Sequence, residues 1–215
     1  MLLCAATPFE IEPTRQFVER QNLQEKVHFV ITGIGAMAAT YYITRAINSH
    51  KPALLLQAGV AGCFDENLAL GTTVAVSSEC VGDLGVVENK MFTSIFDLGL
   101  TQQNDFPWKD ARLFNPHIDV LQKAGLQQVN SVTVNEITTN DDRIRYYKSN
   151  LGAGIENMEG AALHFVGLKE DIPFLQIRAI SNYIGERDKS KWLLQKAIEN
   201  LNTNLQKVLK KLMKP

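Results

Sequence analysis

Three polar side chains stand where the sequence could place them around a small ligand. Glu10 follows the first apolar run by a few residues, Glu159 opens a predicted helix, and Asn182 ends the last apolar run. One carboxylate that deprotonates a water, with a second that accepts hydrogen bonds from sugar hydroxyls, would form a site that cleaves a glycosidic bond. The alternatives are that Glu159 only complements the positive end of a helix and that Glu10 is a solvated helix residue.

Glycines mark two further predicted strand ends. The stretch GIG at residues 33–35 resembles part of a dinucleotide-binding fingerprint, but the third glycine is absent and the next strand ends near Gln57 rather than at an acid. A nicotinamide site is therefore not supported. Together with Gly59 and Gly62, these glycines instead predict turns in which the backbone approaches a ligand closely.

Apolar runs bounded by turn residues alternate along the chain with stretches of helical period. The runs, which we expect to form strands, span residues 2–6, 27–31, 53–58, 73–76, 129–134 and 174–180. The expected helices span residues 10–21, 36–48, 158–169 and 191–212. This alternation predicts one α/β domain over residues 1–215, a three-layer fold with a mixed, largely parallel central sheet flanked by helices. Ligands of such sheets bind at the carboxyl ends of the strands, where the polar and glycine-containing segments lie.

One long connection interrupts the alternation. Residues 82–108 contain Asp83, Gly85, Gly99 and Pro107 and show no clear period, so we expect a single irregular connection. It is either a lid over the site or only a surface loop.

The composition excludes several classes of function. Lys and Arg number 22 against 23 Asp and Glu, so there is no basic excess to hold a nucleic acid. The N-terminal residues lack the basic start and long apolar stretch of a signal peptide or membrane span, which predicts a cytoplasmic protein without a membrane partner.

Cys4, Cys63 and Cys80 lie far apart in apolar stretches and are expected to be buried thiols. The 4 histidines show no metal-binding spacing, so no metal site is expected.

Five segments carry a resemblance that runs over nearly the whole chain. They read AATPFEI, GIGAMAA, LQAGVAG, IENMEGAA and RAISN. In order and approximate spacing they resemble the motifs of the purine nucleoside phosphorylase and nucleosidase superfamily, and NMEGAA with RAIS is the specific part. The Met-Glu pair resembles the methylthioadenosine and S-adenosylhomocysteine nucleosidases, which hydrolyse an N-glycosidic bond. Those enzymes carry Asp where this sequence has Asn182, and the ending SNYIGERD instead resembles the futalosine hydrolase branch.

The resemblance implies a role for each matched position. Glu10 would activate the attacking water, and Glu159 would hold the ribose hydroxyls as positive charge develops at the anomeric carbon. Met158 would lie under the ribose, and Ile34 beside the 5′ substituent. Asn157 replaces a Glu that is common in the adenine-specific relatives and would contact a hydroxyl. The backbone that borders the nucleoside would come from Val60, Ala61 and Gly62.

The resemblance also implies how the purine is read. A departing purine accumulates negative charge, so a donor near its N7 or O6 atom stabilises the transition state more than the ground state. The Asn182 amide can donate to O6 of hypoxanthine, whereas an ionised Asp would face that carbonyl unpaired. Glu136 lies in the segment where related 6-oxopurine phosphorylases place a base-reading Glu, and it would accept the N1 hydrogen. The alternative for Glu136 is a solvated loop carboxylate.

The sequence gives less direct evidence for the identity of the nucleophile and for the residues that bind the 5′ tail of the substrate. No set of arginines follows the predicted strands to hold a phosphate, which favours water as the nucleophile, although Arg45 and Arg178 are candidates for such a role. Arg187 or Lys189 could pair with an anionic 5′ tail, with Trp192 beside it, or these residues could form only a charged helix start.

The resemblance implies a homo-oligomer, a dimer or larger, that binds a small purine nucleoside and uses no cofactor. A futalosine nucleosidase is the first hypothesis. Another 6-oxopurine nucleoside hydrolase or phosphorylase, and an adenine-specific nucleosidase, are the alternatives. A nucleoside-binding module without catalysis is disfavoured, because a binder has no need of the water-activating Glu10.

Overall fold

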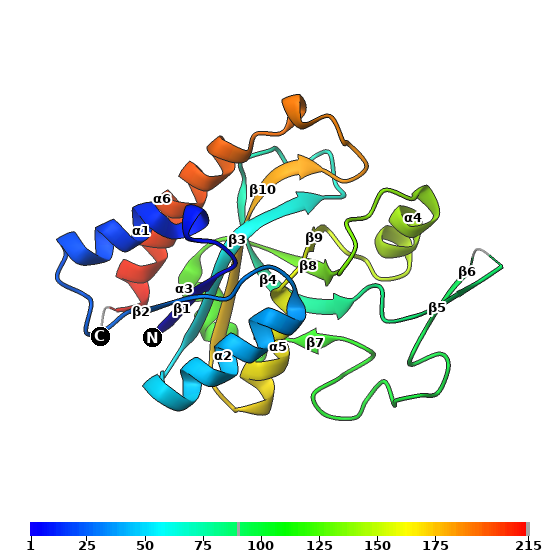
Figure 1. Cartoon of the computed structure of the whole chain (residues 1–215), viewed down its shortest axis with the longest axis horizontal. Coiled ribbons are helices and arrows are strands. Elements are labelled where there is room, and N and C mark those ends of the chain that lie inside the picture. The colour runs from blue at the N-terminus through cyan, green and yellow to red at the C-terminus, as the bar shows by residue number, and fades with distance from the viewer. Residues whose placement is uncertain (90, 214–215) are drawn as a thin grey trace.

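The computed structural model describes residues 1–89 and 91–213 (Figure 1). The strands are β1 (Leu2–Ala5), β2 (His28–Ile31), β3 (Leu55–Cys63), β4 (Thr73–Val81), β5 (Gly85–Glu88), β6 (Met91–Ser94), β7 (Leu113–Phe114), β8 (Gln127–Thr133), β9 (Ile155–Asn157) and β10 (Phe174–Tyr183). The helices are α1 (Pro8–Arg20), α2 (Ala36–His50), α3 (Ile118–Ala124), α4 (Asp141–Ser149), α5 (Gly160–Lys169) and α6 (Leu194–Leu212), with a short 3-10 turn at Lys189–Lys191.

The central sheet is mixed and partly closed. Its order is β10-β4-β8-β9-β3-β1-β2, and β10 also pairs with β3, so that β3, β10, β4, β8 and β9 form a ring from which β1 and β2 extend. Neighbours β1–β2, β1–β3, β3–β10, β4–β8 and β8–β9 are parallel, whereas β10–β4, β3–β9 and β4–β7 are antiparallel. The strands β1, β3 and β10 therefore bring their carboxyl ends to the same edge.

Helices cover both faces of the sheet, because alternate residues of each strand point to opposite sides. In β1, Leu3 and Ala5 pack in one apolar cluster with α1, α3 and α6, while Leu2 and Cys4 pack in another with α2 and α5. The architecture is the α/β fold with a mixed, helix-flanked sheet that the sequence predicts (Figure 1).

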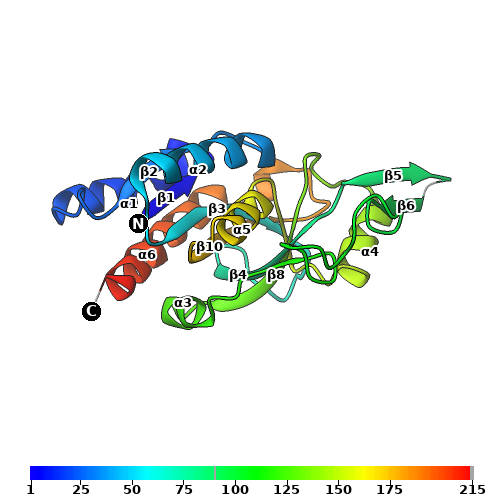
Figure 2. The same ribbon diagram turned by 90° about the horizontal axis from the view of Figure 1, so that it is seen from below.

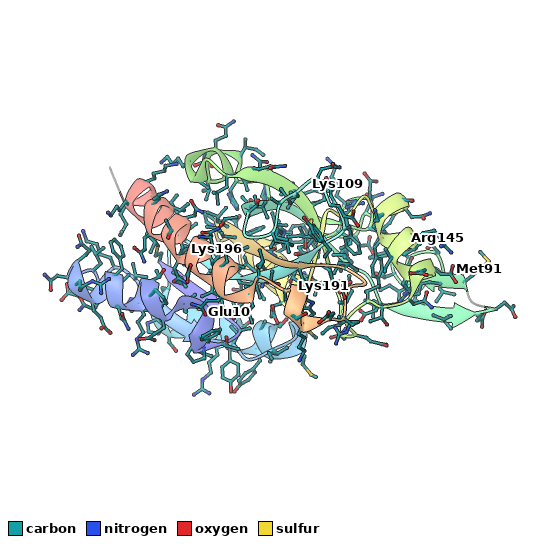
Figure 3. The ribbon with its side chains drawn as sticks, turned by 90° about the horizontal axis from the view of Figure 1, so that it is seen from above. Glu10, Met91, Lys109, Arg145, Lys191 and Lys196 are labelled. Atoms are coloured by element: carbon teal, nitrogen blue, oxygen red, sulfur yellow. The ribbon has the colours of Figure 1, made fainter. Side chains whose placement is uncertain are left out.

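The connection at residues 82–108 differs from the sequence prediction. It contains the antiparallel hairpin β5–β6, which projects with α4 at one end of the molecule (Figures 1 and 2). The Arg143 guanidinium of α4 lies 3.8 Å from the ring centroid of Phe92 in β6. Figure 3 shows Met91 of this hairpin far from Glu10. Two helices, α3 and α4, are absent from the sequence prediction.

The cysteine thiols are buried, and burial raises their pKa values. Cys4, Cys63 and Cys80 are free and buried, as predicted. Burial raises the pKa of the Cys4 thiol to about 12 and that of Cys80 to about 11, so both stay protonated at neutral pH. Among the described helices, none combines the length and apolar character needed to cross a membrane.

Asn202 of α6 joins that helix to the first turns of α1. Its Nδ2 atom donates to the Glu10 carbonyl at 2.9 Å, and its Oδ1 atom accepts from the Thr14 backbone N–H at 3.0 Å and from the Thr14 hydroxyl at 2.6 Å. Glu10 and Thr14 are four residues apart, so the amide bridges one helical turn next to Pro13, which has no N–H to donate. This bridge fixes the turn that carries Glu10.

The change Asn202→Ala is expected to lower the free energy of unfolding by about 2 kcal/mol, because buried backbone groups of α1 lose their partners. Urea denaturation followed by circular dichroism measures the effect. The control is Thr203→Ala on the exposed side of α6, which should change stability by less than about 0.5 kcal/mol. Equal stability of both variants would contradict the bridging role.

Candidate active site

A cavity of about 310 Å³ lies at the carboxyl ends of β1, β3 and β10. Nine of the ten residues selected from the sequence line it: Glu10, Ile34, Val60, Ala61, Gly62, Asn157, Met158, Glu159 and Asn182. Further lining residues are Ala6, Thr7, Phe9, Ile137, Glu156, Ser181, Ile184, Trp192, Leu194 and Ile198. The structure thus brings together segments from both ends of the chain.

Glu10 is held in the first turn of α1 and is buried. Its Oε2 atom accepts from the backbone N–H of Thr7 at 2.9 Å and from the Thr7 hydroxyl at 3.1 Å, as part of a capping box. Its Oε1 atom accepts from the Val60 N–H at 3.2 Å. The carboxylate is therefore fixed between α1 and β3 rather than solvated. These partners leave lone pairs through which it can accept a proton from a ligand.

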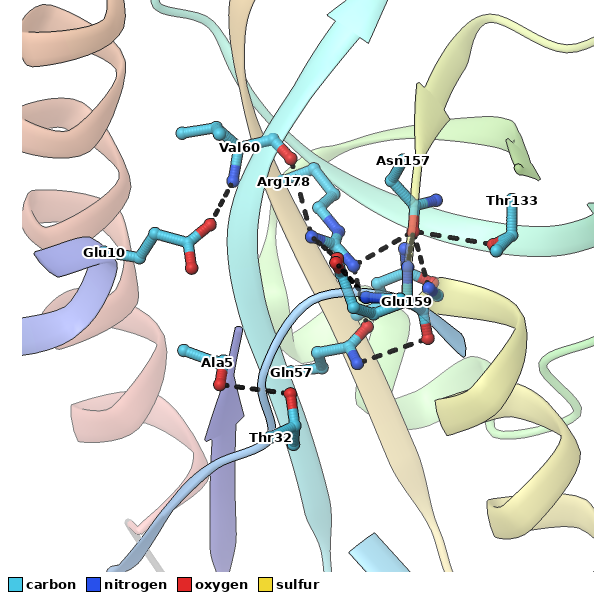
Figure 4. Close-up of polar contacts among 12 residues, drawn as sticks. Ala5, Glu10, Thr32, Gln57, Val60, Thr133, Asn157, Glu159 and Arg178 are labelled. Atoms are coloured by element: carbon cyan, nitrogen blue, oxygen red, sulfur yellow. Dashed lines mark hydrogen bonds and ion pairs between the residues drawn. The ribbon is translucent and has the colours of Figure 1, made fainter. Parts of the chain in front are cut away.

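Glu159 and Arg178 form a buried ion pair beside the cavity (Figure 4). The Arg178 Nη1 atom lies 3.2 Å from Glu159 Oε2, and both side chains are less than a tenth exposed. Glu159 Oε1 accepts from the Gly35 N–H at 3.1 Å, at the start of α2. Glu159 also occupies the N-cap position of α5, so two helix N-termini favour its negative charge. It is not a simple cap, because its side chain makes no hydrogen bond to its own helix.

A network of buried amides holds Arg178 in place. Its Nη2 atom donates to Gln57 Oε1 at 2.9 Å and to Asn157 Oδ1 at 3.1 Å (Figure 4). A Cβ atom at Gly59 would overlap the guanidinium, so a glycine is needed there for steric reasons. The Arg178 side chain faces the protein interior and does not line the cavity.

The Asn157 amide is used inside the protein, although the residue borders the cavity. Its Nδ2 atom donates to Glu79 at 2.7 Å and to Ser131 at 2.8 Å, and its Oδ1 atom accepts from the Glu159 N–H at 2.9 Å. The hydroxyl contact expected from the sequence would need this amide to leave its present partners. In this structure Asn157 bonds to Glu159 and Arg178, and its contact with a ligand hydroxyl stays a prediction.

Glu79 is the buried acid at the base of this network. Burial raises the pKa of Glu79, while hydrogen bonds from Gln176 and Asn157 lower it. The Thr133 hydroxyl also donates to it, at 3.0 Å. Glu79 thus orients the Asn157 amide without reaching the cavity.

Asn182 stands on β10 where that strand carries an irregularity. Ile180 and Asn182 lie opposite the consecutive residues Ala61 and Gly62, so Ser181 is the extra residue of a bulge. The Asn182 Oδ1 atom accepts from the Ser181 hydroxyl at 2.8 Å, and Nδ2 donates to the Tyr183 carbonyl at 3.1 Å. One N–H of the amide is left to donate into the cavity.

Glu136 is the one selected residue that the structure does not bring into this cavity. Its side chain is exposed, and its backbone N–H donates to Asp83 Oδ2 at 3.3 Å. The loop after β8 presents Ile137 to the cavity instead. In this structure Glu136 is therefore a solvated loop carboxylate, which was the alternative to a base-reading role.

The candidates for an anionic 5′ tail divide in the same way. Trp192 lines the cavity and donates from Nε1 to the Glu186 carbonyl at 3.1 Å. Arg187 and Lys189 are exposed and do not line it, although the Arg187 guanidinium lies 5.7 Å from the Trp192 ring centroid. Of these three residues, Trp192 alone lines the cavity.

The ionisable side chains that face the cavity in the described part of the chain are all acids. Among its lining residues in the described part of the chain, Glu10, Glu156 and Glu159 are ionisable acids, and there is no Lys, Arg or His. Arg45 is exposed on α2 and, like Arg178, does not line the cavity. Such a site favours a ligand on which positive charge develops and disfavours a phosphate anion.

Residues 3–214 match the family model of the Phosphorylase superfamily, so the chain belongs to that superfamily. A futalosine hydrolase of Thermus thermophilus is 30% identical over 190 residues, which cover 84% of this chain and 80% of the relative. A 5′-methylthioadenosine/S-adenosylhomocysteine nucleosidase of Listeria welshimeri is 28% identical over 167 residues, covering 74% of this chain and 69% of the relative. A futalosine hydrolase mutant of Helicobacter pylori has the same fold, with a TM-score of 0.78 at 16% identity and 98% coverage of both chains.

The change Arg178→Met is expected to lower the free energy of unfolding by about 3–5 kcal/mol, because it leaves the buried Glu159 carboxylate unpaired. Urea denaturation at neutral pH measures it. The matched control is Arg145→Met, which breaks an exposed ion pair with Asp142 and should cost less than about 1 kcal/mol. Similar small losses in both variants would show that the buried pair does not support the fold.

Proposed function

We propose that the chain hydrolyses the N-glycosidic bond of futalosine, releasing hypoxanthine and dehypoxanthinylfutalosine, a step of the alternative menaquinone pathway. The observation that carries this proposal is the set of groups around the cavity: Glu10, Glu159 and the Asn182 amide, with no cation among the described lining residues. The superfamily membership and the relatives named futalosine hydrolase support the choice of substrate.

Each group has a part in the reaction. Glu10 takes a proton from water, and the water oxygen forms a bond to the anomeric carbon. Glu159 accepts hydrogen bonds from the ribose hydroxyls and stabilises the positive charge that develops on the sugar. The bond to the purine breaks, its electron pair leaves with the base, and the base then takes up a proton. Asn182 donates to O6 or N7 of the base as that negative charge forms.

Water is favoured over phosphate as the nucleophile for an electrostatic reason. A phosphate anion would enter a cavity lined by three acids, with the nearby Arg178 already paired to Glu159. A neutral water meets no such repulsion. No metal or organic cofactor has a part in this mechanism.

The enzyme is expected to release hypoxanthine from futalosine at the same rate with and without phosphate. Chromatographic detection of the free base, with futalosine, inosine and methylthioadenosine as parallel substrates, checks this. Release that requires phosphate would identify a phosphorylase. Release of adenine alone would identify an adenine-specific nucleosidase and overturn the proposal.

The change Glu10→Gln is expected to lower kcat by about 10²–10⁴-fold, because an amide cannot take the proton from water. Binding of hypoxanthine should persist, since the substituted amide keeps the size of the native side chain. The control is Glu19→Gln at the exposed end of α1, which should retain full activity. Steady-state kinetics and calorimetry together separate loss of catalysis from loss of the site.

The homo-oligomer expected from the sequence, and action in the cytoplasm, stay predictions. Large apolar side chains are exposed at the cavity and along α2, and they offer a surface for a second copy of the chain: Phe9 and Ile34, which line the cavity, and Met37 and Tyr41 of α2. Light scattering on the purified protein measures its mass in solution. A monomeric mass at micromolar concentration would remove the prediction.

A further inference from the structure

Glu156 of β9 is a buried carboxylate that the mechanism above does not use. It is 5% exposed and lines the same cavity as Glu10 and Asn182. The Thr138 backbone N–H donates to its Oε1 atom at 3.1 Å. Its Oε2 atom is buried and has no hydrogen-bond partner among the described residues. A buried acceptor without a partner destabilises a fold, so this oxygen is suited to a partner that arrives with a ligand.

The surroundings of Glu156 add to that cost. Burial raises the pKa of Glu156, the hydrogen bond from Thr138 lowers it, and the nearby Asp83 raises it. Within the described part of the chain, no ion pair joins Glu156 to a cation. A ligand N–H that donates to Oε2 would favour the carboxylate form and supply the missing partner.

The strand register places Glu156 across from Asn182. Gly62 of β3 pairs with Asn182 of β10 on one side and with Glu156 of β9 on the other. Neighbouring strands lie about 4.8 Å apart, so the two outer backbones are about 10 Å apart at this level. A Cβ atom at Gly62 would lie 3.4 Å from Asn182 Nδ2 and would overlap Ile184, another lining residue. The glycine thus makes room for the Ile184 side chain, which lies over Gly62 and lines the cavity next to the amide.

A 6-oxopurine presents atoms that are complementary to the Glu156 carboxylate and the Asn182 amide, which both line the cavity. Its N1–H is a donor, its O6 and N7 atoms are acceptors, and the three lie in sequence along one edge of the base. A 6-aminopurine instead has a lone pair at N1, which would face a carboxylate oxygen without a hydrogen between them. The pair of a fixed acceptor and an amide donor therefore distinguishes the two classes of base.

We infer that Glu156 is the residue that accepts the N1 hydrogen of a 6-oxopurine, while Asn182 donates to O6 or N7. This inference rests on the proposed function and names the determinant of its base specificity. It moves the role first assigned to Glu136 to a residue that lies in the cavity. Glu136 is exposed and outside it, and so provides the matched control.

The test measures equilibrium binding of hypoxanthine and of 1-methylhypoxanthine, which lacks the N1 hydrogen, by calorimetry. Wild-type protein should prefer hypoxanthine by at least about tenfold. Glu156→Gln keeps a neutral acceptor and should weaken hypoxanthine binding by roughly tenfold. Glu156→Met keeps the size but no strong acceptor, and should bind the two bases with nearly equal affinity. Glu136→Gln should keep the wild-type preference.

Two results would overturn the inference. One is loss of the preference in Glu136→Gln with retention in Glu156→Met. The other is an unchanged preference in both Glu156 variants, with circular dichroism confirming that they fold. Wild-type turnover of futalosine is measured in parallel and decides the proposed function separately. Hypoxanthine release with unchanged base preference in the variants would refute only the role of Glu156.

Discussion

The geometry of the cavity depends on the buried ion pair between Arg178 and Glu159. Both charges have left water, so each must be satisfied by groups of the protein, and removing either would leave the other uncompensated. The guanidinium holds Gln57 and Asn157, and the carboxylate reaches the start of α2 through the Gly35 N–H. One pair of charges thus ties the sheet to α2 and α5.

The same pair determines the electrostatic character of the site. Arg178 supplies its positive charge from behind the cavity wall and leaves only acids on the lining surface that the structure describes. For the proposed reaction, this arrangement suits a sugar that becomes positive and a base that departs toward the neutral amide of Asn182. The amide of Asn157 already has partners inside the protein, because it accepts a hydrogen bond from Arg178 and donates one to Glu79.

Much of this site follows from the sequence, because polar residues after parallel strands converge at one edge of a sheet. Glu10 after β1 and Asn182 on β10 meet in one cavity for that reason, because both strands run parallel to β3. Glu159 reaches the same cavity from β9, which runs antiparallel to β3. Glu136 follows an apolar run in the same way, yet the loop turns so that Ile137 faces inward. The hydrophobic pattern of a strand does not encode the direction of the loop residues that follow it.

Other features depend on contacts between distant segments. Glu156 interrupts an apolar stretch, and a charged residue in such a strand indicates a functional or buried polar site. The side of the sheet to which its side chain points depends on the pairing of β9 with β3. Helix α4 carries many charges and buries Tyr147 alone among its described residues, so its apolar period is too weak to detect. The bulge at Ser181 arises from pairing and is invisible in one strand read alone.

The bridge from Asn202 to α1 has a consequence for synthesis of the protein. Glu10 belongs to the earliest helix, but the amide that secures its turn, and the apolar wall at Ile198, belong to α6. During translation, Glu10 would leave the ribosome long before Asn202 and Ile198 are synthesised. The site would therefore be complete only late in translation, when α6 emerges and packs against α1.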